Sequence, residues 1–576
     1  MRFFRLKSFL RFKHLIFLTA VLLYGCAGQI TMVPTLSQKS VIKPDEGIVT
    51  VRIIDTSNTY LPFNMFTINP KELNESKKVK PLRLEALERT NNSAIVFASP
   101  VKAGSYSVSD MMAFYTIGEY IYRRWAIPAN DFGTFEVKAG QVTDLGTILY
   151  YPKPVGDKYS QVVAQAPDSS VGEVLEKYFP FYKYSKELLL GWNDDGRDEE
   201  RMTVYASIAQ NPITYNSAYR APDGSIFFPS KLGVILQRTA NGEWKTDAVD
   251  TNFDLNDIKQ SKRGDLIVAG DEGKLFFKAK GKNWQDLSLK YDNKIHEINF
   301  TDDKTIELVT SDSHTVYISH GTIKNNKVNW KEIIRFSSAR GWHKEGDKLT
   351  TEAIKGRSGK TLGKRKIAYA SVIDFDGKQY FKIALRASSG RSISKRITYI
   401  RNGTTDFTET SKDLQFAFTK MSGNTKVGME IDEGFWSTDY YYFHYNQITK
   451  EWEKMSKKVY PCTGKQKDLV YHPDCKTKKS RGKSFSFNTL PWFKTNDIAY
   501  ASVSVSGEKD EYLFMTKDGG LSWEDTKHKF PNDRCYSLVA ESRNSLLVSC
   551  KGSSGDFYES KDGGATWKHV RQHESF

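Results

Sequence analysis

The same eight-residue pattern occurs twice near the C-terminus, as TKDGGLSW at 516–523 and as SKDGGATW at 560–567. The two copies begin 44 residues apart. An aspartate carboxylate can accept backbone N–H bonds inside a turn, glycine permits the positive φ that tight turns need, and tryptophan offers a large apolar surface for packing between units. The pattern therefore predicts a repeated turn between β-strands. Its structural residues are Thr516, Asp518, Gly520, Trp523, Ser560, Asp562, Gly564 and Trp567.

Weaker versions of this closure, a turn followed by an aromatic residue, recur upstream. They end at Trp244, Trp284, Trp330, Trp452 and, less clearly, Phe407. The tryptophan closures are 40, 46, 122, 71 and 44 residues apart, and the two long gaps can hold additional units or insertions. Such recurrence is typical of repeat architectures. The predicted units cover 218–244, 255–284, 294–330, 367–407, 413–452, 497–523 and 535–567. A strand over 203–209 is expected to join the last unit and close a ring.

The two clear copies resemble the Asp box, S/T-x-D-x-G-x-T/S-W, of the BNR-repeat, sialidase-type β-propeller superfamily. The resemblance implies an all-β fold with a seven-bladed β-propeller over 203–572, although the spacing also allows six or eight blades. It implies that Asp518 and Asp562 form turns at the blade periphery and take no part in catalysis. A closed propeller leaves only short, protected strand edges.

Composition excludes several classes of protein. The chain has 576 residues, of which 13% are aromatic, and this content excludes wholesale disorder. No apolar run reaches the length of a membrane-spanning helix, which excludes a polytopic membrane protein. The chain is also longer than the roughly 250–300 residues that one core supports. We therefore expect more than one domain. Strand-like runs indicate a small β-rich domain over 47–151, and residues 135–152 resemble small β-sandwich modules of bacterial lipoproteins, which implies a β-sandwich-like fold for it. A short helical linker is expected over 168–202, where Ser170 and Glu173 fit a capping box.

The N-terminus has the features of an export signal. Five basic residues and no acidic residue precede an apolar stretch of 11 residues, which ends at Leu23-Tyr24-Gly25-Cys26. This order resembles a bacterial lipobox and implies a signal peptide over 1–25, lipidation of Cys26 and a tether over 26–46. By resemblance to enterobacterial lipoproteins, Ala27 implies the outer membrane. The alternative is an ordinary secretory peptide followed by a chance cysteine.

The other four cysteines suit an oxidising compartment. Cys535 and Cys550 are equidistant from the centre of a predicted turn, so the hairpin register places them opposite one another and predicts a disulfide. Cys462 and Cys475 are expected to form a second disulfide. Free buried thiols are the alternative for the first pair. No cysteine or histidine spacing fits a metal site, and no cofactor is expected.

The basic surplus is concentrated in two segments. The whole chain carries +16, and removing the leader leaves +11. Residues 454–483 carry +8 and residues 355–366 carry +6, so the rest is slightly acidic. We expect both segments to be loops inserted between blades, where they bind an anionic partner. A merely solvated charged loop is the alternative. The candidate anion-binding residues are Lys360, Lys364, Arg365, Lys366, Lys476, Lys478, Lys479 and Arg481.

One motif raises the alternative of an enzyme. Tyr219-Arg220-Ala221-Pro222 is similar to the aromatic-Arg-Ile-Pro motif of sialidases, in which the arginine binds a carboxylate. Alanine replaces the isoleucine here, and no spacing identifies the other arginines that the family needs. An ordinary turn before a strand is the competing interpretation. Arg220 is therefore the only catalytic candidate, and it belongs to the alternative of a sialidase-like glycoside hydrolase.

These features together predict an outer-membrane lipoprotein of the cell envelope, facing either the periplasm or the outside. We expect its propeller to be a non-enzymatic binding or assembly scaffold. Its expected partners are the membrane, through the lipid on Cys26, and a protein or an anionic glycan or lipid. Nucleic acid is not an expected partner in this compartment.

Overall fold

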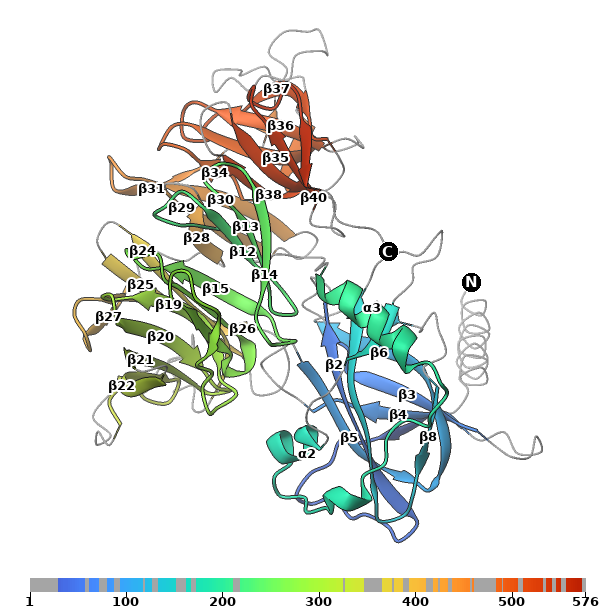
Figure 1. Ribbon diagram of the computed structural model, residues 1–576. Helices are drawn as coiled ribbons and strands as arrows, with labels where there is room; N and C mark the ends of the chain where they lie inside the picture. Colours follow the sequence, from blue (N-terminus) through green and yellow to red (C-terminus); the bar gives the residue numbers. More distant parts are fainter. Residues whose placement is uncertain are drawn as a thin grey trace, which may run out of the picture. The chain divides into compact units, whose positions relative to one another are not determined.

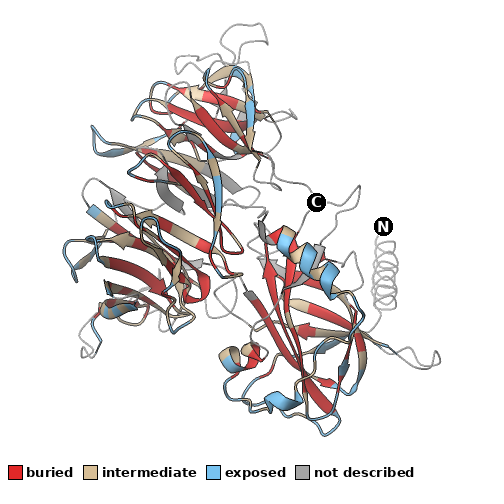
Figure 2. Ribbon diagram, viewed as in Figure 1, coloured by how far each residue is buried: buried red, intermediate tan, exposed pale blue. Residues whose placement is uncertain are grey.

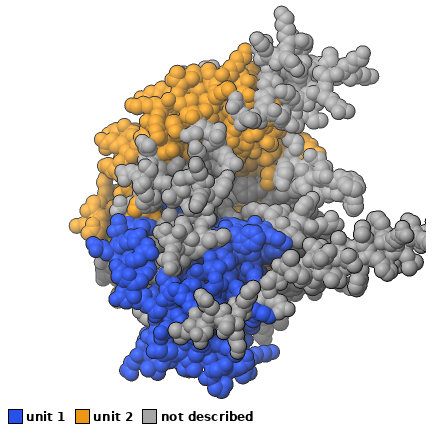
Figure 3. All heavy atoms as spheres, turned by 90° about the vertical axis from the view of Figure 1, so that its right-hand side faces the viewer, with its two compact units in different colours: residues 1–206 blue, residues 207–576 orange. Residues whose placement is uncertain are grey.

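The computed structural model describes two compact units, residues 1–206 and 207–576 (Figure 3). The described residues are 30–56, 62–71, 80–87, 94–117, 120–126, 133–151, 162–166, 172–210, 218–324, 327–345, 365–375, 378–386, 393–410, 418–422, 425–433, 438–455, 458–459, 483–488, 490–505, 511–531, 535–540, 545–550 and 556–571. Buried residues run mainly along the strands of both units (Figure 2). The prediction of a nearly all-β chain is confirmed.

Unit 1 is a sandwich of two sheets. The first sheet has the order β1 (Thr31–Val33), β4 (Leu82–Glu85), β3 (Met65–Pro70), β6 (Gly104–Ile117) and β7 (Tyr120–Ala126), and β8 (Thr134–Val137) also pairs with β6. The second has the order β10 (Val162–Ala166), β9 (Val142–Tyr151), β2 (Glu46–Asp55) and β5 (Ala94–Lys102). Alternate residues of β2, such as Val49 and Val51, enter the core between the sheets.

The opposite face of β2 is covered by a short helix, so this strand is buried on both faces. Helix α2 (Glu173–Tyr178) packs Val174 and Leu175 there. Its N-cap is Gly172, whose N–H donates to the Asp144 carboxylate at 2.7 Å. The capping box expected at Ser170 and Glu173 involves Ser170, which lies outside the described residues; the helix itself starts after Gly172.

Two further expectations about the flanks of this unit are wrong. The tether expected over 26–46 is folded from Thr31 onward: β1 pairs with β4, and Leu36 is buried in the cluster that holds α2. The strand expected over 203–209 lies within helix α3 (Asp198–Gln210). Three acidic residues in the first turn favour the N-terminus of this helix, and this local effect outweighs the β-branched residues that suggested a strand. The 3-10 helix η1 (Lys186–Leu188) lies between α2 and α3.

Unit 2 consists, in its described residues, of seven successive antiparallel sheets (Figure 1). The first is β11 (Tyr219–Arg220), β12 (Ile226–Pro229), β13 (Val234–Arg238) and β14 (Trp244–Ala248); the second is β15 (Leu255–Gln260), β16 (Leu266–Gly270), β17 (Leu275–Lys278) and β18 (Gln285–Asp286); the third is β19 (Lys294–Phe300), β20 (Thr305–Ser311), β21 (Thr315–Lys324), β22 (Lys327–Ser337) and β23 (Gly341–His343). The fourth is β24 (Lys366–Phe375), β25 (Lys378–Arg386), β26 (Ile393–Arg401) and β27 (Phe407–Glu409); the fifth is β28 (Phe418–Ser422), β29 (Thr425–Glu433), β30 (Thr438–Asn446) and β31 (Glu451–Lys454). The sixth is β32 (Lys458–Val459), β33 (Lys483–Phe487), β34 (Trp492–Phe493), β35 (Ala499–Val505), β36 (Glu511–Thr516) and β37 (Glu524–Lys529); the seventh is β38 (Cys535–Ala540), β39 (Leu546–Cys550), β40 (Asp556–Ser560) and β41 (Lys568–Arg571).

These sheets pack in a closed cycle, which is the arrangement of a β-propeller. Each sheet shares a hydrophobic cluster with the next, and the last shares one with the first. Pairs that share a cluster are, in order around the cycle, Ile235 and Val268, Ile267 and Leu308, Phe336 and Phe381, Tyr380 and Tyr445, Val427 and Phe514, Leu513 and Leu546, and Leu547 and Phe228.

Side chains close the cycle between the first and seventh sheets. The ring of Phe557 lies 5.0 Å from that of Phe228 and 4.7 Å from that of Trp244, measured between centroids. Nearby, Arg238 donates to the Glu559 carboxylate at 2.6 Å, and both side chains are nearly buried. These contacts take the place of the closing strand that was expected over 203–209.

The two repeated turns have the same hydrogen bonds. In the first, Asp518 Oδ1 accepts from Ser522 N at 2.9 Å, and Thr516 Oγ1 accepts from Gly520 N at 2.8 Å. In the second, Asp562 Oδ1 accepts from Thr566 N at 2.9 Å, and Ser560 Oγ accepts from Gly564 N at 2.7 Å.

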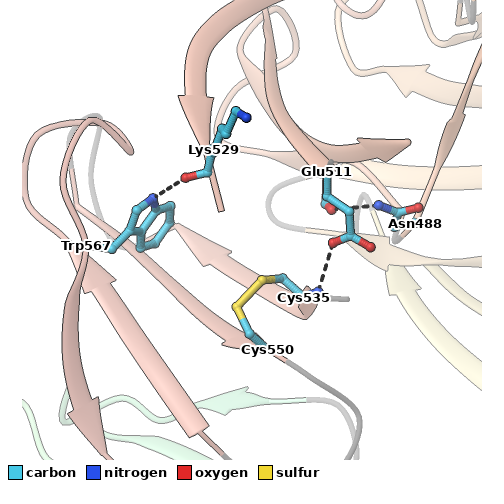
Figure 4. The surroundings of a disulfide bond; sticks show 7 residues. Asn488, Glu511, Lys529, Cys535, Cys550 and Trp567 are labelled. Atoms are coloured by element: carbon cyan, nitrogen blue, oxygen red, sulfur yellow. Dashed lines mark hydrogen bonds between the residues drawn. A yellow bond between two sulfur atoms is a disulfide. The ribbon is translucent and has the colours of Figure 1, made fainter. Parts of the chain in front are cut away.

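Packing of these turns explains their glycine and tryptophan. Gly564 has a φ of 98°, and a Cβ there would lie 2.4 Å from the Leu513 side chain of the sixth sheet. Trp523 is fully buried in the cluster shared by the fifth and sixth sheets. Trp567 donates to the Lys529 carbonyl of the sixth sheet at 3.0 Å (Figure 4). Each turn therefore attaches its sheet to the preceding one.

A disulfide joins Cys535 of β38 to Cys550 of β39, as the hairpin register predicted (Figure 4). The two residues are directly opposite each other in the ladder. The backbone N–H of Cys535 also donates to the Glu511 carboxylate of β36 at 3.2 Å. The second predicted pair, Cys462 and Cys475, lies outside the described residues.

Candidate functional site

Turns at one end of the first three sheets enclose two adjacent hollows. One, of about 450 Å³, lies between the β11–β12, β15–β16 and β17–β18 turns. The other, of about 420 Å³, lies between the β15–β16, β17–β18 and β19–β20 turns. Arg263, Ala279 and Lys280 line both. In an antiparallel meander, alternate turns lie at the same end of the sheet, so all these turns meet there. We call the two hollows together the basic hollow.

Tight turns built from polar residues hold this site. Asp265 and Ser261 close the β15–β16 turn, where Asp265 N donates to Ser261 Oγ at 3.0 Å. The Asp265 carboxylate also accepts from Lys280 N at 3.0 Å, which ties the β17–β18 turn to the β15–β16 turn. Gly264 has a φ of 92°, a conformation that other residues rarely adopt. The backbone carrying the basic side chains is therefore held in place by short local bonds.

Basic side chains outnumber acidic ones around the basic hollow, by six to three. The basic residues are Lys262, Arg263, Lys278, Lys280, Lys282 and Lys304, and the acidic residues are Asp223, Asp265 and Asp303.

Two of the six basic side chains are already engaged by carboxylates. Arg263 lies between Asp265 and Asp303, at 3.7 and 3.5 Å. Lys278 pairs with Asp247 at 2.6 Å.

The other four lysines remain available to a ligand. Lys262, Lys280, Lys282 and Lys304 are exposed and form no ion pair with any described residue. The remaining acid, Asp223, accepts from Gln260 Nε2 and Ser225 N at 2.8 Å each. Burial raises the pKa of Asp223, but the hydrogen bonds from Gln260 and Ser225 outweigh this effect and hold its pKa below the usual value. The hollow thus combines a fixed carboxylate with a surplus of free ammonium groups, which favours an anion.

A second group of charged side chains, at the opposite end of these sheets, is paired internally. Lys231 binds Asp254 at 3.2 Å, and Lys294 binds Asp271 at 3.2 Å. Burial, reinforced by the charge of Lys294, lowers the pKa of neighbouring His296 to about 3, so this imidazole is neutral at pH 7. This group satisfies its own charges, so we do not take it as the binding site.

Most of the predicted anion-binding residues lie outside the described residues, namely Lys360, Lys364, Lys476, Lys478, Lys479 and Arg481. Arg365 N donates to Ser338 Oγ at 2.7 Å just before β24, and Lys366 begins that strand. The basic segment 454–483 begins at the end of β31 in the fifth sheet and ends at the start of β33 in the sixth, and its residues 460–482 lie outside the described residues.

Arg220 lies in β11, exposed at the first sheet. Partial burial of its guanidinium and the nearby charge of Arg238 lower its pKa. A later arginine that could have served a carboxylate site, Arg401, is held by Glu307 and Gln379 at 2.9 and 2.7 Å. The structure does not bring Arg401 to Arg220, because its guanidinium is committed to the contact between the third and fourth sheets.

The two turn aspartates are engaged in their own turns. Burial raises the pKa of Asp518, but hydrogen bonds from Ser522 and Thr516 outweigh it and lower the pKa. Hydrogen bonds from Thr566 and Ser560 lower the pKa of Asp562 to about 2. Both carboxylates are therefore ionised acceptors at neutral pH.

The basic hollow was not predicted from the sequence. Its signal was present as SKRGD at 261–265 and KAKGK at 278–282, two short turns that each carry basic residues around a glycine. A count of net charge hides such a site, because Asp223, Asp265 and Asp303 accompany these basic residues in the sequence. Only the meander brings the turns to the same end.

Comparison with known proteins gives similar folds and no family. No protein-family model matches the chain, and no curated protein matches it. Solved structures do match. The YCF48 protein from Cyanidioschyzon merolae is 14% identical, with a TM-score of 0.35 over 61% of this chain and 96% of its own. YCF48 bound to D1 peptide is 12% identical, with a TM-score of 0.33 over 60% and 94%. The β-propeller domain of the Trilobed protease from Pyrococcus furiosus is 10% identical, with a TM-score of 0.34 over 63% and 97%.

Two further features are absent from the described residues. No helix there is both long and apolar enough to cross a membrane. No group of three or more histidine, cysteine, aspartate or glutamate side chains there could hold a metal ion.

Proposed function

We propose that this protein is a membrane-anchored lipoprotein whose propeller is a non-enzymatic scaffold, and that the basic hollow binds an acidic segment of a protein partner. The observation that carries the proposal is the set of four exposed lysines without described ion pairs around two connected hollows. Ammonium groups on a rigid rim attract a row of carboxylates without requiring a precise geometry.

Several features of the chain support the remaining parts of the proposal. The repeated turns have the spacing of Asp boxes and the local hydrogen bonds expected of them, so we propose that they are Asp boxes. The lipobox-like sequence supports export and lipidation at Cys26, with the outer membrane as the destination. The basic segments 355–366 and 454–483 are proposed to extend the anionic contact.

A binding assay tests the basic hollow. Full-length protein is titrated with a fluorescent poly-glutamate peptide at two salt concentrations. The variant Lys280→Glu/Lys282→Glu should bind about tenfold more weakly, since each lost attraction at an exposed site is worth about 0.5–1 kcal/mol. Binding of the native chain should also weaken with salt.

The control has the same change in net charge in a sheet that does not line the basic hollow. Lys561 and Lys568 are exposed in the seventh sheet, so Lys561→Glu/Lys568→Glu should reduce binding far less. Equal losses in both variants would refute a local site. Binding to heparin or to phosphatidylglycerol vesicles in preference to the peptide would reassign the hollow to a glycan or a lipid.

The non-enzymatic part of the proposal is tested with a fluorogenic sialoside. We expect no turnover. Turnover that disappears in Arg220→Ala would replace the scaffold with the sialidase-like alternative.

A further inference from the structure

We propose that the edge of unit 1 at β1 lies flat on the bilayer surface, with Ile30, Met32 and Val41 in contact with lipid. This inference rests on the proposed lipidation of Cys26. It adds an orientation to the anchor: the N-terminal sandwich docks on the membrane through a defined face.

The first support is an exposed apolar group at this edge. Ile30, Met32 and Val41 have exposed fractions of 39%, 42% and 85%. Met32 and Val41 line the same open cleft of about 680 Å³, together with Pro34, Pro70 and other residues. Large apolar side chains gathered at one place on a surface commonly mark a binding or membrane face.

The second support is the reach of the chain. Only three residues lie between Cys26 and Ile30, so their Cα atoms are at most about 14 Å apart when the chain is fully extended. The chain is fixed immediately afterwards: Thr31 N donates to the Pro81 carbonyl at 3.1 Å, β1 pairs with β4, and Leu36 is buried. An acyl chain on Cys26 would therefore hold this edge close to the headgroups, with no long tether to let the domain rotate away.

The third support is the charge around the cleft. Lys43 and Lys102, on its rim, have side-chain exposed fractions of 65% and 69%, and Lys71 is exposed beside them. Glu46 and Asp45 pair with the first two, at 3.1 and 3.6 Å, so Lys71 is the rim lysine that forms no ion pair with a described residue. Apolar side chains flanked by lysines are suited to an interface in which tails lie below and anionic headgroups above.

Photo-crosslinking to lipid tests this orientation. A benzophenone amino acid replaces Met32 or Val41 in the full-length protein, which is purified with its anchor, placed in vesicles of phosphatidylethanolamine and phosphatidylglycerol, and irradiated. Mass spectrometry then reports lipid adducts. We expect adducts at positions 32 and 41.

The matched control is Leu188, an apolar residue of the same unit with an exposed fraction of 54%. It should give no adduct above background. The same spectra report whether Cys26 carries acyl chains, which separates the two possible failures. An acylated protein without adducts at 32 and 41, or with equal adducts at 188, would overturn the orientation alone, whereas a protein without acyl chains would overturn the proposed anchor and this inference with it.

Discussion

Replacement of Phe557 by alanine should open the propeller where its first and seventh sheets meet. Phe557 is fully buried, and its ring lies against Phe228 of β12 and Trp244 of β14. Truncation of a buried phenylalanine costs about 3–5 kcal/mol. At about 1.4 kcal/mol per factor of ten, hydrogen-exchange protection should fall by two to four powers of ten.

Hydrogen exchange followed by mass spectrometry is the suitable assay, since it reports the two units separately. Peptides from 226–238 and from 546–560 should lose protection together in Phe557→Ala, whereas peptides of unit 1 should not. Tyr291→Ala, at a residue with an exposed fraction of 72%, is the control and should change the free energy of unfolding by less than about 0.5 kcal/mol.

A double-mutant cycle with Phe228→Ala should give a coupling of about 0.5–1.5 kcal/mol, the usual value for an aromatic pair. Loss of protection in 546–560 with none in 226–238 would refute closure by direct contact between these sheets. The expectation of a ring closed by side chains would then have to be abandoned.

Three further predictions concern stability. Cys535→Ser/Cys550→Ser should destabilise unit 2 by about 3 kcal/mol, as for a loop of about 15 residues; the seventh-sheet peptides in hydrogen exchange would report it, and unchanged protection would contradict it. Burial lowers the pKa of His296 to about 3, whereas its pKa is about 6.5 in the unfolded chain. Its contribution to the stability of the folded state is therefore fully present above pH 6.5 and is lost as the pH falls towards 3. The melting temperature should fall less over this window in His296→Gln. Burial and the charge of Arg396 lower the pKa of Lys382 to about 7, whereas its pKa is about 10.4 in the unfolded chain. Its contribution to the stability of the folded state therefore grows as the pH rises from 7 to 10. Lys382→Met should flatten this rise in stability, and an equal rise in both proteins would show that Lys382 ionises normally.

The sequence predicted the parts of the fold whose interactions are local. The cross-strand pairing of Cys535 and Cys550 followed from the symmetry of one hairpin. The prediction of a strand at 203–209 is wrong, because these residues lie in helix α3. The prediction of a helix cap at Ser170 differs from the structure, in which the N-cap of α2 is Gly172. At 203–209 the competing interaction is local, in the acidic first turn of α3. At the start of α2 it is not local, because the N–H of Gly172 donates to Asp144, 28 residues away.

The candidate site was less accessible to sequence reasoning. Charge counting pointed to the two segments with the greatest surplus, 355–366 and 454–483. The basic hollow escaped this count because Asp223, Asp265 and Asp303 accompany its lysines in the sequence, and hydrogen bonds or ion pairs occupy them in the structure.

The sequence alone determined the repeated turns, because every partner of Asp518 and Asp562 within them lies at most four residues away. Those hydrogen bonds need no residue from another sheet. The tertiary structure decided how the ring closes and where free positive charge gathers. Arg238 and Glu559 are 321 residues apart, and the turns of the basic hollow come from three different sheets. Contacts of that range exist only once the sheets have packed against one another, and no local pattern records them.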